Sequence, residues 1–116
     1  VLRLGEQYLI RAEARAQQNT AASLSAAKDD IDEIRDRAGL GAYSGAVTKD
    51  ALLLAVEQER RIELFSEWGH RWFDLKRTGK AGAVLGPIKA DWQETDLLYP
   101  IPESAIKTNK NLTQNP

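Results

Sequence analysis

The stretch ERRIELFSEWGHRWFDLKR, from Glu59 to Arg77, combines ten ionisable side chains with several aromatic ones. Two kinds of chemistry use such residues. Glu67 and His70 have the Glu-x-x-His spacing of di-iron carboxylate sites, in which Glu63 could bridge the metal ions. Alternatively, two of the glutamates could act as general acid and general base, as the paired carboxylates of glycosidases do.

Both chemistries lack parts that they require. A di-iron site needs the Glu-x-x-His motif on two helices, whereas His70 is the only histidine and Gly69 is expected to break the helix between the two ligands. A glycosidase pair needs an open cleft, which nothing in the sequence indicates, and the many nearby arginines keep carboxylates ionised. We therefore predict no catalytic residue, no metal site and no cofactor.

The glutamates lie instead on a predicted helix that begins after Thr48 and runs to about Ser66 or Glu67. Their four-residue spacing places them beside apolar residues of that helix. A buried carboxylate without a partner costs several kcal/mol, so we expect arginine partners, with Arg60, Arg71 or Arg77 the nearest in sequence. The predicted structural ion-pair network comprises Glu59, Arg60, Glu63, Glu67, Arg71, Asp74 and Arg77.

The three tryptophans divide into two groups. Trp68 and Trp72 lie four residues apart, and we expect both to pack in the core together with Phe73. Trp92 lies among polar residues in KADWQETD, which is predicted to be a loop, and loops often carry binding residues. Trp92 is therefore the candidate for stacking on a sugar ring.

Two further helices precede this region. Residues 1–18 are rich in helix-forming residues and carry a stripe of Leu2, Leu9, Ala12 and Ala16. In the second helix Leu24, Ala27, Ile31, Ile34 and Ala38 recur at spacings of three and four, and Gly39 is placed to end it. Together they predict a tetratricopeptide-like hairpin over residues 1–38.

The remaining segments are expected to be less regular. Residues 39–48 form a glycine-rich connector without the spacing of a phosphate-binding loop. A short helix is predicted from His70 to Thr78, with a stop at Gly79. Residues 80–96 should be loop, 97–102 (LLYPIP) extended, and PESAIKTN one helical turn. The predicted fold class is thus mostly α: hairpin, long helix, short helix and irregular C-terminal segment.

Composition limits the classes of function. The 116 residues suffice for one core, and the net charge of −1 offers no field to attract nucleic acid. No apolar run approaches the ~20 residues of a membrane span. The chain lacks methionine and begins inside a helical pattern. These features predict a piece of a longer protein, whose first helix exposes Leu2, Leu9 and Ile10 when upstream helices are missing.

Five collinear segments resemble the C-terminal end of the SusD/RagB family of outer-membrane lipoproteins. They are YLIRAEARAQ (8–17), IDEIRDRAGL (31–40), ERRIELFSEWGHRWFDLKRTG (59–79), LLYPIP (97–102) and NKNLTQNP (109–116). One departure is that Trp68 stands between Glu67 and Gly69, where the family often has Glu followed directly by Gly. The resemblance spans nearly the whole chain.

The resemblance implies a non-catalytic protein that captures glycans or other nutrients and delivers them to a TonB-dependent transporter. It implies surface exposure at the outer membrane, a lipid anchor on an N-terminal Cys missing here, and an oligosaccharide site built mainly by upstream parts. Residues 1–116 would be the C-terminal helical portion, divided into a hairpin (1–38), core helices (48–79) and an irregular tail (80–116). The alternative is a helical-repeat module that binds a protein partner.

Overall fold

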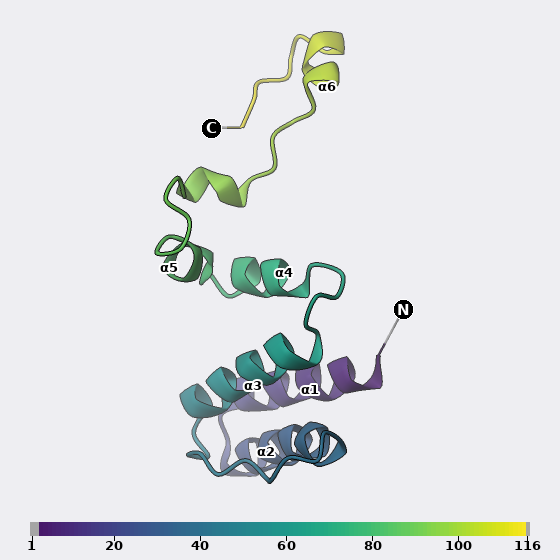
Figure 1. Ribbon diagram of the computed structural model, residues 1–116, viewed down its shortest axis with the longest axis vertical. Helices are drawn as coiled ribbons and strands as arrows, with labels where there is room; N and C mark the ends of the chain where they lie inside the picture. The colour runs from purple at the N-terminus through teal and green to yellow at the C-terminus, as the bar shows by residue number, and fades with distance from the viewer. Residues whose placement is uncertain (1–2, 116) are drawn as a thin grey trace. The chain divides into compact units, whose positions relative to one another are not determined.

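The computed structural model describes residues 3–115, which form six α-helices and one short 3-10 helix, without a strand in that range (Figure 1). The chain divides into two compact units, the first ending at His70 and the second beginning at Arg71. No helix within the described range is both long and apolar enough to cross a membrane.

The first unit starts with the predicted hairpin. Helix α1 spans Leu4–Gln18 and ends at Asn19, whose left-handed backbone (φ 55°) reverses the chain. Helix α2 spans Ala21–Arg37. Thr20 and Ser23 cap its start reciprocally: the Ser23 N–H donates to Thr20 Oγ1 over 3.1 Å, and the Thr20 N–H donates to Ser23 Oγ over 3.0 Å.

The connector to the third helix is tied to α2. The Tyr43 N–H donates to Asp32 Oδ1 over 2.6 Å, and Arg35 Nε donates to the Gly41 carbonyl over 2.8 Å. Burial tends to raise the pKa of Asp32, but the hydrogen bonds from Lys28 and Tyr43 outweigh it and hold that pKa below its usual value. The connector therefore has a fixed path to α3, which spans Lys49–Glu63.

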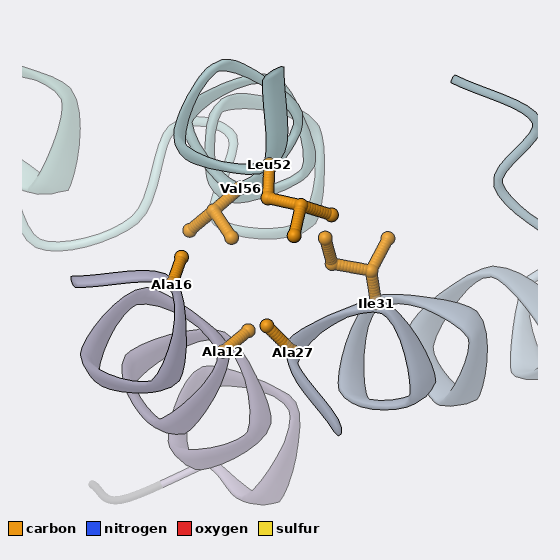
Figure 2. Packing of buried hydrophobic residues seen from close by; sticks show 6 residues of the cluster. All are labelled: Ala12, Ala16, Ala27, Ile31, Leu52 and Val56. Atoms are coloured by element: carbon orange, nitrogen blue, oxygen red, sulfur yellow. The ribbon is translucent and has the colours of Figure 1, made fainter. Parts of the chain in front are cut away.

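The core lies where α1, α2 and α3 meet. Figure 2 shows its central side chains pointing toward one another from the three helices: Ala12, Ala16, Ala27, Ile31, Leu52 and Val56. Alanines on α1 and α2 let these two helices approach closely, while the larger side chains of α3 and α2 fill the remaining space. Both predicted apolar stripes face this core.

The details of the stripes differ from the expectation at two positions, Leu9 and Ala38. Leu9 is fully buried, so the prediction that it would be exposed is wrong: it faces inward with Ala12 and Ala16. Ile10, on the other side of α1, is 47% exposed as expected. Ala38 is exposed because α2 has already ended there. Leu2 lies outside the described residues.

Helix α3 ends at Glu63, three to four residues earlier than predicted. Ser66 (φ 60°), Trp68 (φ 42°) and Gly69 (φ 74°) have left-handed backbone, which a right-handed helix cannot contain. This tight turn starts the direction change before Gly69, the residue at which the sequence suggested a break.

The second unit is built from short helices. Helix α4 spans His70–Arg77 and ends before Gly79 (φ 68°), as predicted. Helix α5 (Ala81–Leu85) and the 3-10 helix η1 (Glu94–Leu97) occupy a segment that was wrongly predicted to be loop throughout. Helix α6 (Glu103–Thr108) is the predicted helical turn. Leu75 and Ala81 are the buried apolar residues of this unit.

Candidate functional site

Asp30 is the most completely buried charged side chain of the three-helix unit, and two arginines of α1 bind it. Arg11 donates through Nη2 at 2.6 Å and through Nε at 3.1 Å, and Arg15 Nη1 donates at 2.6 Å. The hydrogen bond and the charge of Asp30 raise the pKa of Arg11. This carboxylate therefore joins α2 to α1 rather than serving a reaction.

Asp30 was not predicted to be a site residue, although the sequence contains a signal for it. Asp30 falls within the apolar stripe of α2, three residues after Ala27 and next to Ile31. A carboxylate in that register must be buried, and Arg11 and Arg15, four residues apart on α1, are spaced to reach it together.

The predicted network residues of α3 pair with arginines from the first two helices. Arg35 Nη1 lies 2.7 Å from Oε1 of the buried Glu59. Glu63 accepts from Arg3 Nη2 at 2.9 Å and from Arg37 Nη2 at 2.5 Å. These contacts tie the C-terminal half of α3 to both other helices.

Arg3 extends this arrangement to the turn after α3. Its Nη1 donates to the Glu67 carboxylate and, over 3.3 Å, to the Glu63 carbonyl. Glu67 lies outside helix α3, but Arg3 contacts both Glu63 and Glu67 and so holds the two carboxylates close together. Gly5 adds to the close packing, because a Cβ there would lie 2.9 Å from Glu63 Oε1.

Further contacts involve the other predicted network members. Arg60 is buried with Nη2 3.7 Å from Oε1 of Glu6, which is also 3.7 Å from His70 Nδ1. Asp74 pairs with Arg77 at 2.9 Å in the second unit, where Arg71 is half-buried. In the structure Arg3, Arg35 and Arg37 pair with the glutamates, whereas the sequence favoured arginines that lie close to the glutamates along the chain. That all seven residues act as one network stays a prediction.

The geometry gives the two reactive interpretations little support. Glu67 and His70 do not share a helix, because α4 begins at His70 and Gly69 separates the two residues. Across residues 3–115, no three His, Cys, Asp or Glu side chains gather where they could hold a metal ion. Glu59, Glu63 and Glu67 each face a guanidinium, an arrangement that stabilises a fold.

The aromatic residues are less buried than predicted. Trp68 is 77% exposed and Phe65 is 79% exposed, because the turn after α3 directs both away from the helical core. Phe73 is also exposed. The prediction that Trp68 and Phe73 belong to the core of this chain is therefore wrong, while Trp72 is half-buried.

Trp92 packs within the second unit. Its ring meets that of Trp72 edge to face, with centroids 6.3 Å apart, and its Nε1 lies 3.4 Å from Glu94 Oε1. Lys76 Nζ lies 5.4 Å from the ring centroids of both Trp72 and Tyr99. These contacts fix the ring of Trp92, and a sugar contact there stays a prediction.

Comparison with known proteins assigns the fold to a family. A model of the SusD family matches residues 1–91. The chain belongs to the SusD family. A crystal structure of a SusD superfamily protein from Bacteroides vulgatus has the same helical fold, with a TM-score of 0.84 and 30% identity over 98% of this chain.

Two curated relatives align along nearly the whole chain. SusD-like protein P2 from Formosa agariphila is 32% identical over 98% of the chain, and the starch-binding protein SusD from Bacteroides thetaiotaomicron is 34% identical over 99%. The chain spans 24% and 20% of these two proteins, and 26% of the Bacteroides vulgatus chain. It thus corresponds to about a quarter of its relatives.

Proposed function

We propose that the chain is the C-terminal helical portion of a SusD-like protein that captures glycans or other nutrients at the cell surface without cleaving them. The observation that carries this proposal is the family match over residues 1–91. An alignable relative that is named a starch-binding protein favours a glycan as the ligand.

In this proposal the whole protein is lipid-anchored at the outer membrane and passes its ligand to a TonB-dependent transporter. The hairpin of residues 1–38, the core helices of 48–79 and the tail of 80–116 form the scaffold, and upstream parts make most ligand contacts. The polar side chains of the three-helix unit fit a supporting role, since arginines hold Asp30, Glu59 and Glu63 in place.

The test uses the full-length protein that contains this chain. Calorimetry with a panel of oligosaccharides should show saturable binding of at least one of them, and chromatography of the same mixtures should show no shortened products. Binding of no sugar, peptide or other nutrient in a broad panel would contradict nutrient capture. The appearance of cleavage products would contradict the non-catalytic assignment.

The proposed delivery step has its own experiment. Affinity purification of the tagged full-length protein from outer membranes should recover a TonB-dependent transporter in a stoichiometric complex. The 116-residue chain, lacking the proposed upstream contacts, should bind the same oligosaccharides weakly or not at all. Tight sugar binding by this chain alone would mean that the ligand site lies within these 116 residues, and Trp92 would then be the first residue to test.

A further inference from the structure

Lys76, on helix α4, is a half-buried cation whose neighbours in the structure are aromatic rings. Its Nζ lies 5.4 Å from the ring centroid of Trp72 and 5.4 Å from that of Tyr99. Within residues 3–115 no carboxylate lies at salt-bridge distance from this ammonium group, although Asp30 and Glu59 are each paired with arginine. Aromatic faces attract the ammonium, but they leave its N–H donors without an anionic acceptor.

The acidic side chains of the second unit do not supply that acceptor. Asp74, two residues before Lys76 and so on another side of α4, pairs with Arg77 at 2.9 Å. Glu94 lies 3.4 Å from Nε1 of Trp92. Two more carboxylates have other contacts, Asp96 with the Gln93 N–H at 3.0 Å and Glu103 with Lys107 at 2.9 Å, and Asp91 is exposed without a contact to Lys76. The charge of Lys76 is thus available to an anion from outside this unit.

Tyr99 presents an exposed ring from a backbone that is held in place. The side chain is 65% exposed. Asn115 Nδ2 donates to the Tyr99 carbonyl over 2.7 Å. The Gln114 amide pairs with both backbone groups of Ile101, accepting from its N–H at 2.7 Å and donating to its carbonyl at 3.0 Å. Pro100 between them restricts the backbone further, so little ordering of this segment is needed on binding.

A cation beside an exposed aromatic ring suits one class of ligand. The C–H groups of a sugar ring pack on an aromatic side chain, and an ammonium group attracts a negatively charged substituent. A neutral sugar would use Tyr99 but not the charge of Lys76. A small inorganic anion would use the charge but not the ring. A sugar that carries an acidic group would use both.

We propose that Lys76 and Tyr99 form a subsite for an acidic sugar unit, one that bears a carboxylate or a sulfate ester. Both groups offer the same chemistry, a negative charge on several oxygen acceptors. The inference rests on the proposed function, because the subsite would hold one unit of a glycan bound mainly by upstream parts. It narrows the ligand from glycans in general to acidic ones.

Amine acylation of the unaltered full-length protein tests the subsite directly. The protein is treated with a water-soluble acetylating ester, and peptide mass spectrometry gives the rate at each lysine. Three oligosaccharides of equal length are compared as probes: an oligogalacturonate, a sulfated galacto-oligosaccharide and a neutral gluco-oligosaccharide. Lys107 is the matched control, because its exposed side chain already has a carboxylate partner in Glu103.

We expect Lys76 to react in the absence of sugar and to be protected by at least one acidic probe. At a probe concentration five times the dissociation constant, acylation of Lys76 should slow about sixfold, because only about one site in six is then free. Lys107 should change by less than about twofold under the same conditions. The neutral probe should leave the rate at Lys76 unchanged, and the stronger of the two acidic probes identifies the preferred acidic group.

Substitutions measured by calorimetry separate the charge from the ring. Lys76→Gln should weaken binding of the protective probe about fivefold, the loss of one partly exposed ion pair, whereas Lys76→Arg should retain most of the affinity. Tyr99→Ala should weaken it as well, and Lys107→Gln should not. Circular dichroism checks the fold of each variant. If a variant does not fold, the acylation rates of the unaltered protein still decide.

Four results would each overturn the proposal. Lys76 that is unreactive without sugar would be covered by the rest of the polypeptide. Equal protection by the neutral probe would show that no acidic group is recognised, and equal protection by inorganic sulfate at the same concentration would show that no sugar is needed. Protection by neither acidic probe would leave no ligand for the subsite.

The outcome for the subsite can be distinguished from that for the proposed function. If calorimetry shows that the full-length protein binds an oligosaccharide while Lys76 reacts equally fast with and without it, the proposed function stands and the subsite fails. If the protein binds no nutrient of any kind, the proposed function fails and the subsite fails with it.

Discussion

At the scale of single residues, the chain buries carboxylates and supplies each with an arginine from another helix. Asp30 receives Arg11 and Arg15, Glu59 receives Arg35, and the pairs cross from one helix to the next. Breaking such a pair is costly because the remaining charge loses its partner in a partly dry environment. These positions therefore report directly on the stability of the three-helix unit.

Replacement of Asp30 gives the largest expected effect. We expect Asp30→Ala to lower the free energy of unfolding by about 3 kcal/mol, since it removes the charged acceptor of three N–H donors and leaves Arg11 and Arg15 without a carboxylate. Urea unfolding followed by circular dichroism measures this loss. The exposed neighbour Asp29 is the control, and Asp29→Ala should change the value by less than about 0.5 kcal/mol. Equal effects of the two variants would contradict the structural role of Asp30.

Asp32 makes the stability depend on pH in the acid range. Its pKa in the folded chain is lowered, so its contribution to stability is complete above the pKa of the unfolded chain, near pH 4, and is lost as the pH falls through the folded value. Asp32→Asn should therefore cost about 1 kcal/mol at pH 7, and this difference should shrink below about pH 4. Unfolding curves of both proteins from pH 7 to pH 3 test this. A difference that grows on acidification would contradict the lowered pKa of Asp32 in the folded chain.

For these carboxylates, the sequence predicts the need for an arginine partner but not which arginine it is. That Glu59 and Glu63 need arginines follows from their register beside Leu52 and Val56, and the burial of Glu59 agrees with it. The sequence does not show which arginines pair with them, because Arg35 and Arg3 become neighbours of these glutamates only when helices distant in sequence pack together. Local spacing favours Arg60, whose Nη2 lies 3.7 Å from Glu6 Oε1.

At the scale of secondary-structure elements, helix ends marked by glycine were predicted well. Gly39 follows the end of α2 and Gly79 follows α4, as the sequence predicted. The end of α3 was misplaced because two residues with side chains, Ser66 and Trp68, take the left-handed conformation that glycine usually marks. Near this turn the Glu63 carbonyl and the Glu67 carboxylate accept hydrogen bonds from Arg3, a contact between residues distant in sequence that local patterns do not predict.

The turn after α3 should be stabilised by glycine. Ser66→Gly removes the steric cost of a side chain at φ 60°, about 1 kcal/mol, against a smaller entropic cost in the unfolded chain. We expect a net gain of up to about 0.5 kcal/mol in the free energy of unfolding. Ser25→Gly, at an exposed position within α2, should instead lower it by about 0.5 kcal/mol. Thermal and urea unfolding of the two variants should move in opposite directions.

At the scale of the whole molecule, the chain exposes more large apolar side chains than its three-helix core buries. Leu4, Phe65, Trp68 and Ile88 are each more than two-thirds exposed. The sequence predicted Trp68 to lie in the core, because its neighbours in the sequence are apolar, whereas 77% of it is exposed. Contact with a second molecule would remove the apolar area of these side chains from water, which is favourable.

We therefore expect the 116-residue chain to self-associate when it is produced alone. Light scattering over a concentration series should show a mean mass that rises above that of the monomer. Leu4→Lys should reduce the association because it removes an exposed apolar side chain, and Gln17→Lys, at an exposed polar position of the same helix, should not. A monomer at all concentrations would show that these exposed apolar side chains do not drive association.

The short connection between α1 and α2 also sets an order of assembly. Only Asn19 and Thr20 separate the two helices, so closing the hairpin costs little chain entropy and can occur early. Asp30 then finds Arg11 and Arg15 within its own hairpin, whereas Glu59 and Glu63 are made later, after Arg3, Arg35 and Arg37. On a ribosome, which releases the chain from its N-terminal side, Glu59 and Glu63 would thus emerge after the arginines that pair with them, so neither would have to be buried before its counter-charge exists.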